Sequence, residues 1–257
     1  NPQAGDNVAL GKKYTLNPPP NYSLCTDPSD ATKLTDGVHT QGEGLFWAQK
    51  ETTVGWTRAV PAATITIDLG ATSPIRGVSY STAAEPGNVE WPVSILLLVS
   101  DDDRTYYYAG DLVDLDKEHG SPAAHGSAVH RYRTDKLNTF GRYVKLMIST
   151  DGPYIFVDEI EVRRGPEAPL VRPPEAKEIT DVNAFFREYT VARAIRRRLQ
   201  NDLAAVREAL KGVSARQDLE ASCAAIERDM AGLPIASPLT TTVFPVSDLH
   251  ERVFAVQ

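Results

Sequence analysis

The spacing of apolar residues changes along the chain, and the change falls near Gly165. Before this point, short runs of β-branched and aromatic residues alternate with turn residues, as in antiparallel sandwiches and barrels. No run with a helical period lasts longer than two turns there, which disfavours crossover helices and a parallel sheet. The candidate strands are residues 64–69, 75–82, 93–100, 105–112, 128–134, 141–149 and 155–163.

Two of these runs predict different environments for their side chains. The run 64–69 alternates strictly, which places Ile65, Ile67 and Leu69 on one buried face and polar residues on the other. The run 94–99 is apolar almost throughout, which is typical of a strand covered on both faces.

The part after Gly165 shows a helical period instead. Between residues 181 and 211, apolar residues recur in steps of three and four and define one stripe, with Asp181 as a candidate cap and Gly212 as a candidate end. Ser214 and Gln217 form a capping box for a second helix. We therefore predict an α-helical hairpin over 180–234. Because two helices bury little surface alone, it must pack on the sandwich, on another copy or on a further domain.

Composition supports the same division. The first 165 residues hold all three Trp, nine of the ten Tyr and 15 of the 17 Gly. Residues 166–179 are rich in proline, which fixes φ and removes backbone donors, and predict a stiff extended linker. Residues 239–256 are rich in β-branched and apolar residues, and we predict that 235–257 form an extended tail that begins a further domain.

Net charge and cysteine content exclude several classes of protein. The formal net charge is -7 and the pI is about 5.3, so nucleic acid and anionic membranes are poor candidate partners. No run reaches the roughly 18 apolar residues of a membrane-spanning helix. Cys25 and Cys223 are too few for a disulfide scaffold. Two unpaired buried thiols are the simpler interpretation, and a single bridge between the two regions is the alternative.

Four stretches of the first region carry a resemblance to a known family. They are 7–12, 31–40, 65–70 and 158–162, and their order and spacing matter more than any one of them. Residues 7–165 resemble the discoidin, or coagulation-factor type C, domains and the related family 32 carbohydrate-binding modules. The resemblance implies an all-β galactose-binding-like jelly-roll sandwich of eight strands, whose loops at one end bind ligand. It does not extend to the helical region.

The resemblance also implies a structural calcium ion. Carried over to this sequence, Asp36 and Glu159 would supply carboxylates, Lys33 a carbonyl, and Thr40 a carbonyl or hydroxyl. Calcium prefers six to eight hard oxygen ligands, so these residue types are suitable. Val38 departs from the pattern, because many family members have Asp or Asn there. The alternative is that the Asp-Gly pair is merely a turn and Glu159 a solvated strand residue.

A sugar site needs an aromatic ring for the apolar face of the sugar and fixed polar groups for its hydroxyls. Trp91 and Tyr154 are our first candidates for the ring because both lie in predicted loops, followed by Trp56. Trp47 comes last, since it matches a position that is core in many relatives. The full set of candidate ligand-binding residues is Trp91, Tyr154, Trp56, Arg58, Glu90, Trp47, Tyr22 and His39.

Motifs for catalysis are absent from the sequence. No G-x-S-x-G, H-E-x-x-H, P-loop or G-x-G-x-x-G pattern occurs. His119, His125 and His130 are close in sequence, but their spacing does not place them on one face, so a metal site there is disfavoured.

The leading hypothesis is a non-catalytic carbohydrate-binding module. It would hold a larger carbohydrate-active protein on a polysaccharide or glycan, with the helical hairpin as spacer or docking element for a downstream domain or partner chain. We expect an extracellular or periplasmic location, as for an exported protein. The sequence begins at Asn1 rather than Met, which indicates a processed or engineered N-terminus, so an export signal is either removed or outside the given sequence. One alternative is a protein-interaction or cell-adhesion module, which exposed aliphatic side chains would favour. A second is a fragment of an enzyme whose active site lies in a neighbouring domain.

Overall fold

The computed structural model describes residues 2–41, 46–57, 62–84, 87–167, 170–172, 176–211 and 217–232. The chain divides into two compact units, Asn1–Thr180 and Asp181–Gln257.

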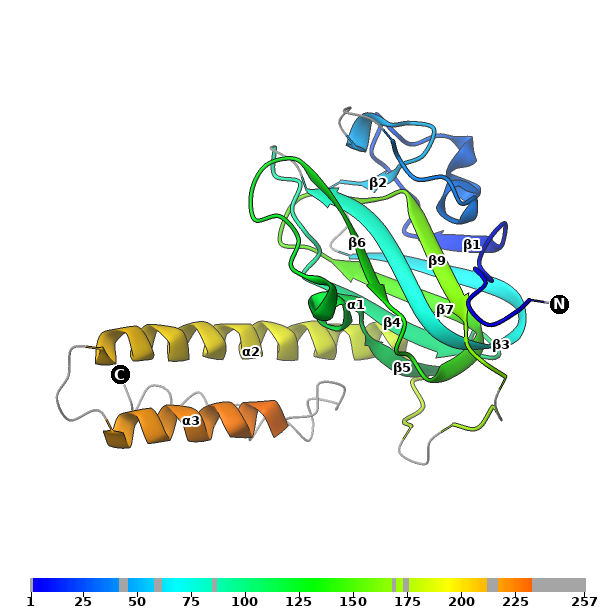
Figure 1. Ribbon diagram of the computed structural model, residues 1–257. Helices are drawn as coiled ribbons and strands as arrows, with labels where there is room; N and C mark the ends of the chain where they lie inside the picture. Colours follow the sequence, from blue (N-terminus) through cyan, green and yellow to red (C-terminus); the bar gives the residue numbers. More distant parts are fainter. Residues whose placement is uncertain are drawn as a thin grey trace. The chain divides into compact units, whose positions relative to one another are not determined.

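The first unit is an antiparallel β-sandwich (Figure 1), as the sequence predicted. In the described residues one sheet has seven strands, in the order β1-β3-β7-β4-β5 with β6 and β9 also paired to β3, and a second sheet joins β2 and β8. A short helix, α1 (Leu112–Leu115), follows β5. The strands are β1 (Lys13–Asn17), β2 (Val54–Trp56), β3 (Ala62–Ala84), β4 (Ser94–Ser100), β5 (Tyr106–Asp111), β6 (Ala128–Thr134), β7 (Thr139–Ser149), β8 (Ile155–Val157) and β9 (Glu159–Arg164).

Strand β3 belongs to both layers of the sandwich. Its first part pairs with β1 and β7, and its second part pairs with β6 and β9. The register against β7 shifts between Asp68 and Ser73, and Gly70 has φ +85° at this bend. The sequence predicted two strands here, 64–69 and 75–82. The structure joins them into one strand, because β3 pairs with β7 on both sides of the bend.

The core confirms both predictions from the apolar pattern. Ile65, Ile67 and Leu69 are buried in the main hydrophobic cluster. Every residue of β4 is buried, as expected for a strand without alternation. Strands β1 and β2 were missed. Polar and apolar residues alternate in β1, but it has only five residues, and β2 has three, which is too few for a pattern.

The end of β5 is fixed by a buried carboxylate. Asp111 caps α1 by accepting a hydrogen bond from the Val113 amide at 3.0 Å. The same side chain accepts from the Ile95 amide at 3.1 Å and from Ser94 Oγ at 2.7 Å. One carboxylate thus joins the start of β4 to the end of β5, and its burial is compensated by these donors.

The segment predicted as a free linker is attached to the sandwich where it is described. Ile179 exchanges two backbone hydrogen bonds of 2.9 Å with Tyr106 at the edge of β5. The Arg172 guanidinium lies 3.9 Å from the centre of the Phe140 ring and 4.2 Å from that of Tyr107, and it pairs with Asp101 at 3.0 Å. These contacts cover the β5 edge, which would otherwise be open to another strand.

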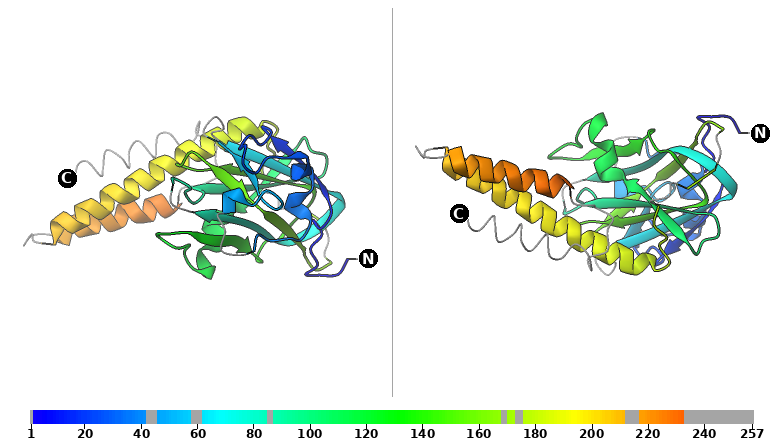
Figure 2. Two further views of the ribbon diagram at one scale, coloured as in Figure 1. Left: turned by 90° about the horizontal axis from the view of Figure 1, so that it is seen from above. Right: turned by 90° about the horizontal axis from the view of Figure 1, so that it is seen from below.

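The described part of the second unit contains two helices, α2 (Val182–Leu210) and α3 (Gln217–Gly232), which lie side by side (Figure 2). Asp181 caps α2 as predicted, accepting a hydrogen bond from the Ala184 amide at 2.8 Å. The helices share one apolar cluster: Leu199, Leu203, Val206, Leu210, Cys223, Ile226 and Met230. The predicted capping residue Ser214 and the predicted tail 235–257 lie outside the described residues.

Two expectations about the whole chain can also be compared with the structure. Cys25 and Cys223 are both free and buried, which confirms the prediction of unpaired thiols. A search of the described part of the chain finds no helix with the length and apolar character needed to cross a membrane.

We expect Gly70→Ala to destabilise the sandwich by about 1 kcal/mol, because a side chain disfavours the positive φ of the β3 bend. The nearest atom to an added Cβ is Lys12 Nζ at 3.5 Å, so crowding contributes little. Gly70→Asn is the matched control, since Asn tolerates positive φ, and should lose less stability. Urea unfolding measures both. Equal stability of Gly70→Ala and the parent would contradict this account of the bend.

Candidate ligand-binding site

Three half-buried aromatic residues gather where loops meet at one end of the sandwich. Tyr22 follows β1, Trp47 lies in the short 3-10 helix Phe46–Ala48, and Tyr154 precedes β8. The Tyr22 ring lies 6.1 Å from the Trp47 ring and 5.6 Å from the Tyr154 ring, centre to centre. We call these three residues the aromatic cluster.

Buried residues hold the aromatic cluster in place. Phe156 stacks with Tyr154 at 5.9 Å between ring centres and makes an edge contact with Tyr22 at 5.0 Å. Cys25, Phe46, Ala83, Val89 and Phe156 form the buried layer against which the cluster packs. Each half-buried ring therefore packs against buried side chains, and this packing fixes the orientation of the ring before any ligand binds.

A neighbouring loop adds a candidate polar partner. A Cβ at Gly152 would lie 3.2 Å from the Glu90 Cβ and 3.0 Å from the Asn88 carbonyl oxygen. The loop that carries exposed Glu90 therefore touches the loop that leads to Tyr154. The structure thus brings together four predicted binding residues, Tyr22, Trp47, Tyr154 and Glu90, in adjoining loops.

Trp56 is a correction to the sequence prediction. It is 0% exposed within the main core cluster, and its indole nitrogen donates a hydrogen bond of 2.8 Å to the Pro18 carbonyl. A ring enclosed on both faces cannot stack on a sugar. Trp56 joins the β2 edge to the loop after β1 and has a structural role.

Trp91 lies in a different group of aromatic residues. Its ring makes edge contacts with His130 and Tyr132 of β6, and its indole nitrogen donates to the Ala123 carbonyl at 2.8 Å. It is partly buried against the main core. Trp91 was a leading candidate and Trp47 the last one, and of these two only Trp47 lies in the aromatic cluster.

The two remaining candidates are Arg58 and His39. Arg58 lies outside the described residues. His39 contacts Arg131 of β6, with 2.7 Å between its Nε2 and the guanidinium nitrogen.

The predicted calcium ligands surround the loop that follows the 3-10 helix Lys33–Thr35. Glu159 Oε2 accepts a hydrogen bond from the Gly37 amide at 3.2 Å, and Asp36 Oδ1 accepts from the Val38 amide at 2.8 Å. Asp158, which the sequence analysis missed, accepts from the Thr40 amide at 2.7 Å. Asp158 and Glu159 each have a second carboxylate oxygen, Asp158 Oδ1 and Glu159 Oε1. Both oxygens are buried without a hydrogen-bond partner among the described residues.

The Lys33 side chain is buried in an ion-pair network of its own. Its Nζ lies 2.6 Å from Asp30 and 3.3 Å from Asp27, and it donates to the Cys25 carbonyl at 3.3 Å. Lys33 was predicted only for its carbonyl oxygen, which this network leaves untouched. The described residues contain no group of three or more His, Cys, Asp and Glu side chains close enough to hold a metal. A cation at this loop would therefore need backbone oxygens as well as carboxylates.

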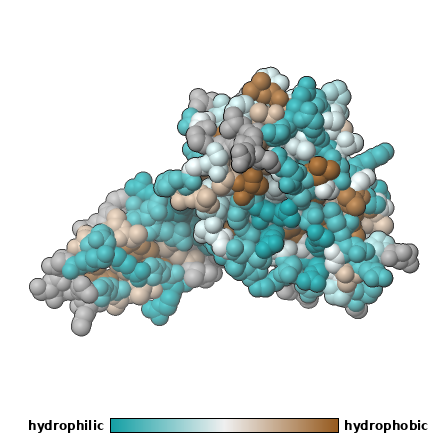
Figure 3. Space-filling view, turned by 45° about the horizontal axis from the view of Figure 1, so that its top comes forward, coloured by the Kyte–Doolittle hydropathy of each residue, from teal (hydrophilic) through white to brown (hydrophobic). Residues whose placement is uncertain are grey.

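Apolar side chains are also exposed on the sandwich. Leu10 is 55% exposed, Leu24 53% and Val38 50%. Leu10 lies beside the loop at Asp36 and Gly37, since its Cδ1 would be 3.0 Å from a Cβ added at Gly37. Figure 3 shows separate apolar spots on a largely hydrophilic face, with no single continuous apolar patch in that view. Scattered residues of this kind are ordinary on protein surfaces.

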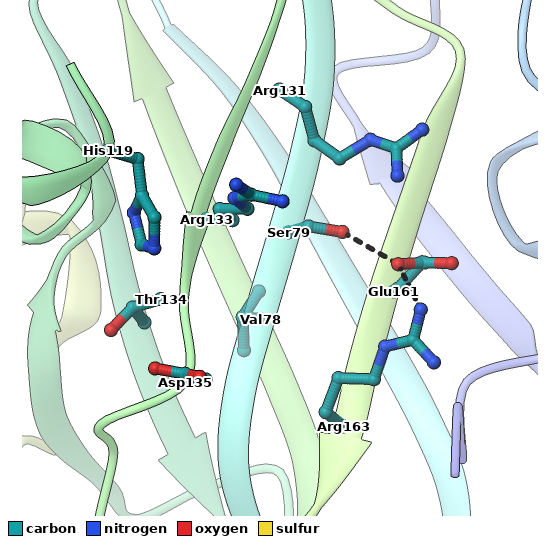
Figure 4. Close-up of a pocket in the computed structure, with 9 residues that line it drawn as sticks. All are labelled: Val78, Ser79, His119, Arg131, Arg133, Thr134, Asp135, Glu161 and Arg163. Atoms are coloured by element: carbon teal, nitrogen blue, oxygen red, sulfur yellow. Dashed lines mark hydrogen bonds and ion pairs between the residues drawn. The ribbon is translucent and has the colours of Figure 1, made fainter. Parts of the chain in front are cut away.

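The outer face of β6, β3 and β9 carries a basic pocket that the sequence analysis missed (Figure 4). Arg131 and Arg133 on β6 and Arg163 on β9 line it, together with His119. The signal in the sequence was the two-residue spacing of Arg131 and Arg133, which places them on one face of a strand. Their meeting with β9 depends on strand pairing, which local sequence does not reveal.

The chain was compared with known proteins. No family model matches it, and no curated protein matches it. Solved structures do match, among them the module CpGH89CBM32-6 produced by Clostridium perfringens, with 17% identity over 62% of this chain and 100% of that one, and a TM-score of 0.39. A Streptococcus pneumoniae fucose binding module has 17% identity over 62% of this chain and 96% of that one, with a TM-score of 0.41.

A third match is CpGH89CBM32-5 from Clostridium perfringens, solved in complex with GalNAc-β-1,3-galactose. It has 18% identity over 60% of this chain and 95% of that one, with a TM-score of 0.39. These matches include family 32 carbohydrate-binding modules, the family that residues 7–165 resemble in sequence. The assignment of a β-sandwich rests on the strand order and register of this chain.

We expect Glu159 to make the stability of the metal-free protein depend on pH. Burial raises the pKa of this carboxyl from 4.5 to about 8. Between these values the unfolded chain has lost the proton while the folded chain keeps it, so stability falls as pH rises. Glu159→Gln lacks this titration. Urea unfolding in chelator, between pH 4.5 and about 8, should therefore show a steeper loss of stability with pH for the parent than for the variant. Parallel curves would contradict the raised pKa of this buried carboxyl.

Proposed function

We propose that the sandwich is a non-catalytic carbohydrate-binding module of an exported protein, and that the aromatic cluster holds the sugar. The observation that carries this proposal is the meeting of Tyr22, Trp47 and Tyr154, half-exposed and rigidly supported, at a loop-built end of the sandwich. The sequence resemblance to discoidin domains and family 32 modules supports the same class of ligand. The wider role, holding a larger carbohydrate-active protein on its polysaccharide with the helices as spacer or docking element, is part of the proposal.

The physical basis is the two-sided character of a sugar. Its C–H face is apolar and gains from contact with a ring face, while its hydroxyls need hydrogen-bond partners fixed in position. The aromatic cluster supplies ring faces for the apolar side of the sugar. Exposed Glu90 on the adjoining loop supplies a hydrogen-bond acceptor for its hydroxyls. Because the rings are already packed on Phe156 and Phe46, little side-chain entropy is lost when the ligand binds.

Substituting Trp47 or Tyr154 by Ala should weaken binding of a neutral glycan by about tenfold each, equivalent to about 1.4 kcal/mol. The glycan is first identified on a neutral glycan array and its affinity is then measured by isothermal titration calorimetry. Tyr143→Ala and Trp91→Ala are the matched controls, since both rings are partly buried but lie outside the aromatic cluster.

The proposal fails if no neutral glycan binds the parent. It also fails if the control variants lose as much affinity as the variants of the aromatic cluster. The first outcome would favour the second candidate function, a protein-interaction module, for which exposed Leu10, Leu24 and Val38 are the supporting observation.

We further propose that a calcium ion stabilises the loop at Asp36. Asp158 Oδ1 and Glu159 Oε1 are buried oxygens that find no hydrogen-bond partner among the residues the structure describes, and burying an unpaired carboxylate is costly. A hard cation would satisfy both. Asp36 and Glu159 would supply carboxylate oxygens, with Lys33 and Thr40 supplying backbone oxygens from the same loop. When bound, the ion would fix the loop geometry and keep Glu159 ionised.

A chelator should lower the melting temperature, and added calcium should restore it. An ion that binds only the folded state stabilises that state by mass action. Glu159→Gln should abolish the effect of calcium, whereas Glu90→Gln, on a different loop, should keep it. Differential scanning calorimetry measures the shift. An unchanged melting temperature in chelator and in calcium would argue against the ion.

A further inference from the structure

The basic pocket lies on a groove that runs along the second part of β3. The middle strand presents only small residues outward, Gly77, Ser79 and Ser81, because Val78 and Tyr80 point into the core. The neighbouring strands carry long side chains at the same level. Ser79 is paired with Arg133 on β6 and with Glu161 on β9. A pocket of about 350 Å³ results, with a serine floor and charged walls (Figure 4).

The acidic groups of the pocket already have partners. Glu161 accepts a hydrogen bond of 2.7 Å from Arg163 and one of 3.2 Å from Ser79 Oγ. Asp135 pairs with Arg76 at 3.4 Å. The positive charge of Arg163 is therefore balanced inside the pocket, and neither carboxylate is free to neutralise the arginines of β6.

Two positive charges remain without a counter-charge. The contact of Arg131 is to the Nε2 of His39 at 2.7 Å. Because a guanidinium only donates, the His39 nitrogen must accept, so this contact supplies no counter-charge for Arg131. The Arg133 guanidinium has no hydrogen bond or ion pair with any side chain that the structure describes, while its backbone amide is held by Asp116 at 2.9 Å.

The geometry suits an anionic ligand with hydroxyl groups. In Figure 4, the Arg131 side chain reaches across β3 towards Glu161, and Arg133 extends over the pocket between His119 and Ser79. Arginine forks match the paired oxygens of a carboxylate or sulfate. Ser79 and Glu161 on the floor and far wall can bind hydroxyls.

We propose that this pocket binds the carboxylate or sulfate group of an acidic polysaccharide. The site shares no residue with the aromatic cluster, and it rests on the proposed function only for the carbohydrate nature of its ligand. Nucleic acid is disfavoured, because the described residues that line the pocket include no Phe, Tyr or Trp on which a base could stack.

The test compares polysaccharides that differ in charge. Affinity gel electrophoresis and calorimetry are run with polygalacturonate, dextran sulfate and neutral dextran, at low and high salt. The parent should bind at least one of the two acidic polymers more than about tenfold tighter than dextran, and this affinity should weaken with salt. Arg131→Ala/Arg133→Ala should lose that preference by about tenfold or more. Arg131→Lys/Arg133→Lys should keep part of it, because the charge remains while the fork is lost.

Controls separate this pocket from the aromatic cluster and from net charge. Arg104→Ala/Arg187→Ala removes the same charge from exposed positions that do not line the pocket, and it should bind as the parent does. Trp47→Ala/Tyr154→Ala should keep the preference for the acidic polymer, so failure at one site is distinguishable from failure at the other. All variants are checked for an unchanged melting temperature.

Four results would overturn the proposal. The first is no preference of the parent for either acidic polymer, and the second is unchanged binding by Arg131→Ala/Arg133→Ala. The third is an equal loss in the control arginine variant. The fourth is tighter binding of single-stranded DNA or of inorganic sulfate alone than of the acidic polymers, which would assign the pocket to another ligand.

Discussion

Strand β3 is the element on which both candidate sites depend, because it is hydrogen-bonded to four other strands. Its bend near Gly70 carries the chain from one layer of the sandwich to the other. Close to the far end of β3, Thr82 Oγ1 and Tyr80 Oη donate to the Phe156 carbonyl at 2.6 and 3.2 Å. They thereby fix the residue on which the aromatic cluster packs. A few residues earlier, Ser79 forms the floor of the basic pocket.

This arrangement separates two kinds of chemistry on one small scaffold. The loop end offers supported aromatic rings, which suit the apolar face of a sugar. The outer face of the β6, β3 and β9 strands offers uncompensated guanidinium groups, which suit an anionic substituent. The overall negative charge of the chain gives no hint of the second surface, because net charge sums over faces that a ligand meets one at a time.

The sequence predicted the elements whose signal is local. The alternation of 64–69 and the continuous apolar run of 94–99 both reported burial correctly, since each depends only on which face of a strand is covered. Strand β6 was predicted with the bounds that the structure has, 128–134. Strand β1 does alternate, with Tyr14 and Leu16 on one face, but it is only five residues long, and the three residues of β2 are too few for a pattern.

The site could be predicted only in part, because its membership depends on contacts between distant segments. Nothing in the spacing of the tryptophans shows that Trp56 pairs with β8 inside the core while Trp47 meets Tyr22 at the surface. Asp158 and Arg133 were missed for a related reason. A carboxylate facing the loop at Thr40 and a guanidinium beside Ser79 become visible only once the strands are paired.

The three tryptophans provide the most direct measurement, because each indole N–H gives its own signal in a 1H–15N NMR spectrum. Trp56 and Trp91 donate to the Pro18 and Ala123 carbonyls, whereas Trp47 lies in the aromatic cluster. On titration with a neutral oligosaccharide that binds, the account predicts a large shift of the Trp47 signal and little change in the other two. A titration that shifts Trp91 or Trp56 and leaves Trp47 unchanged would contradict the assignment of the aromatic cluster as the sugar site.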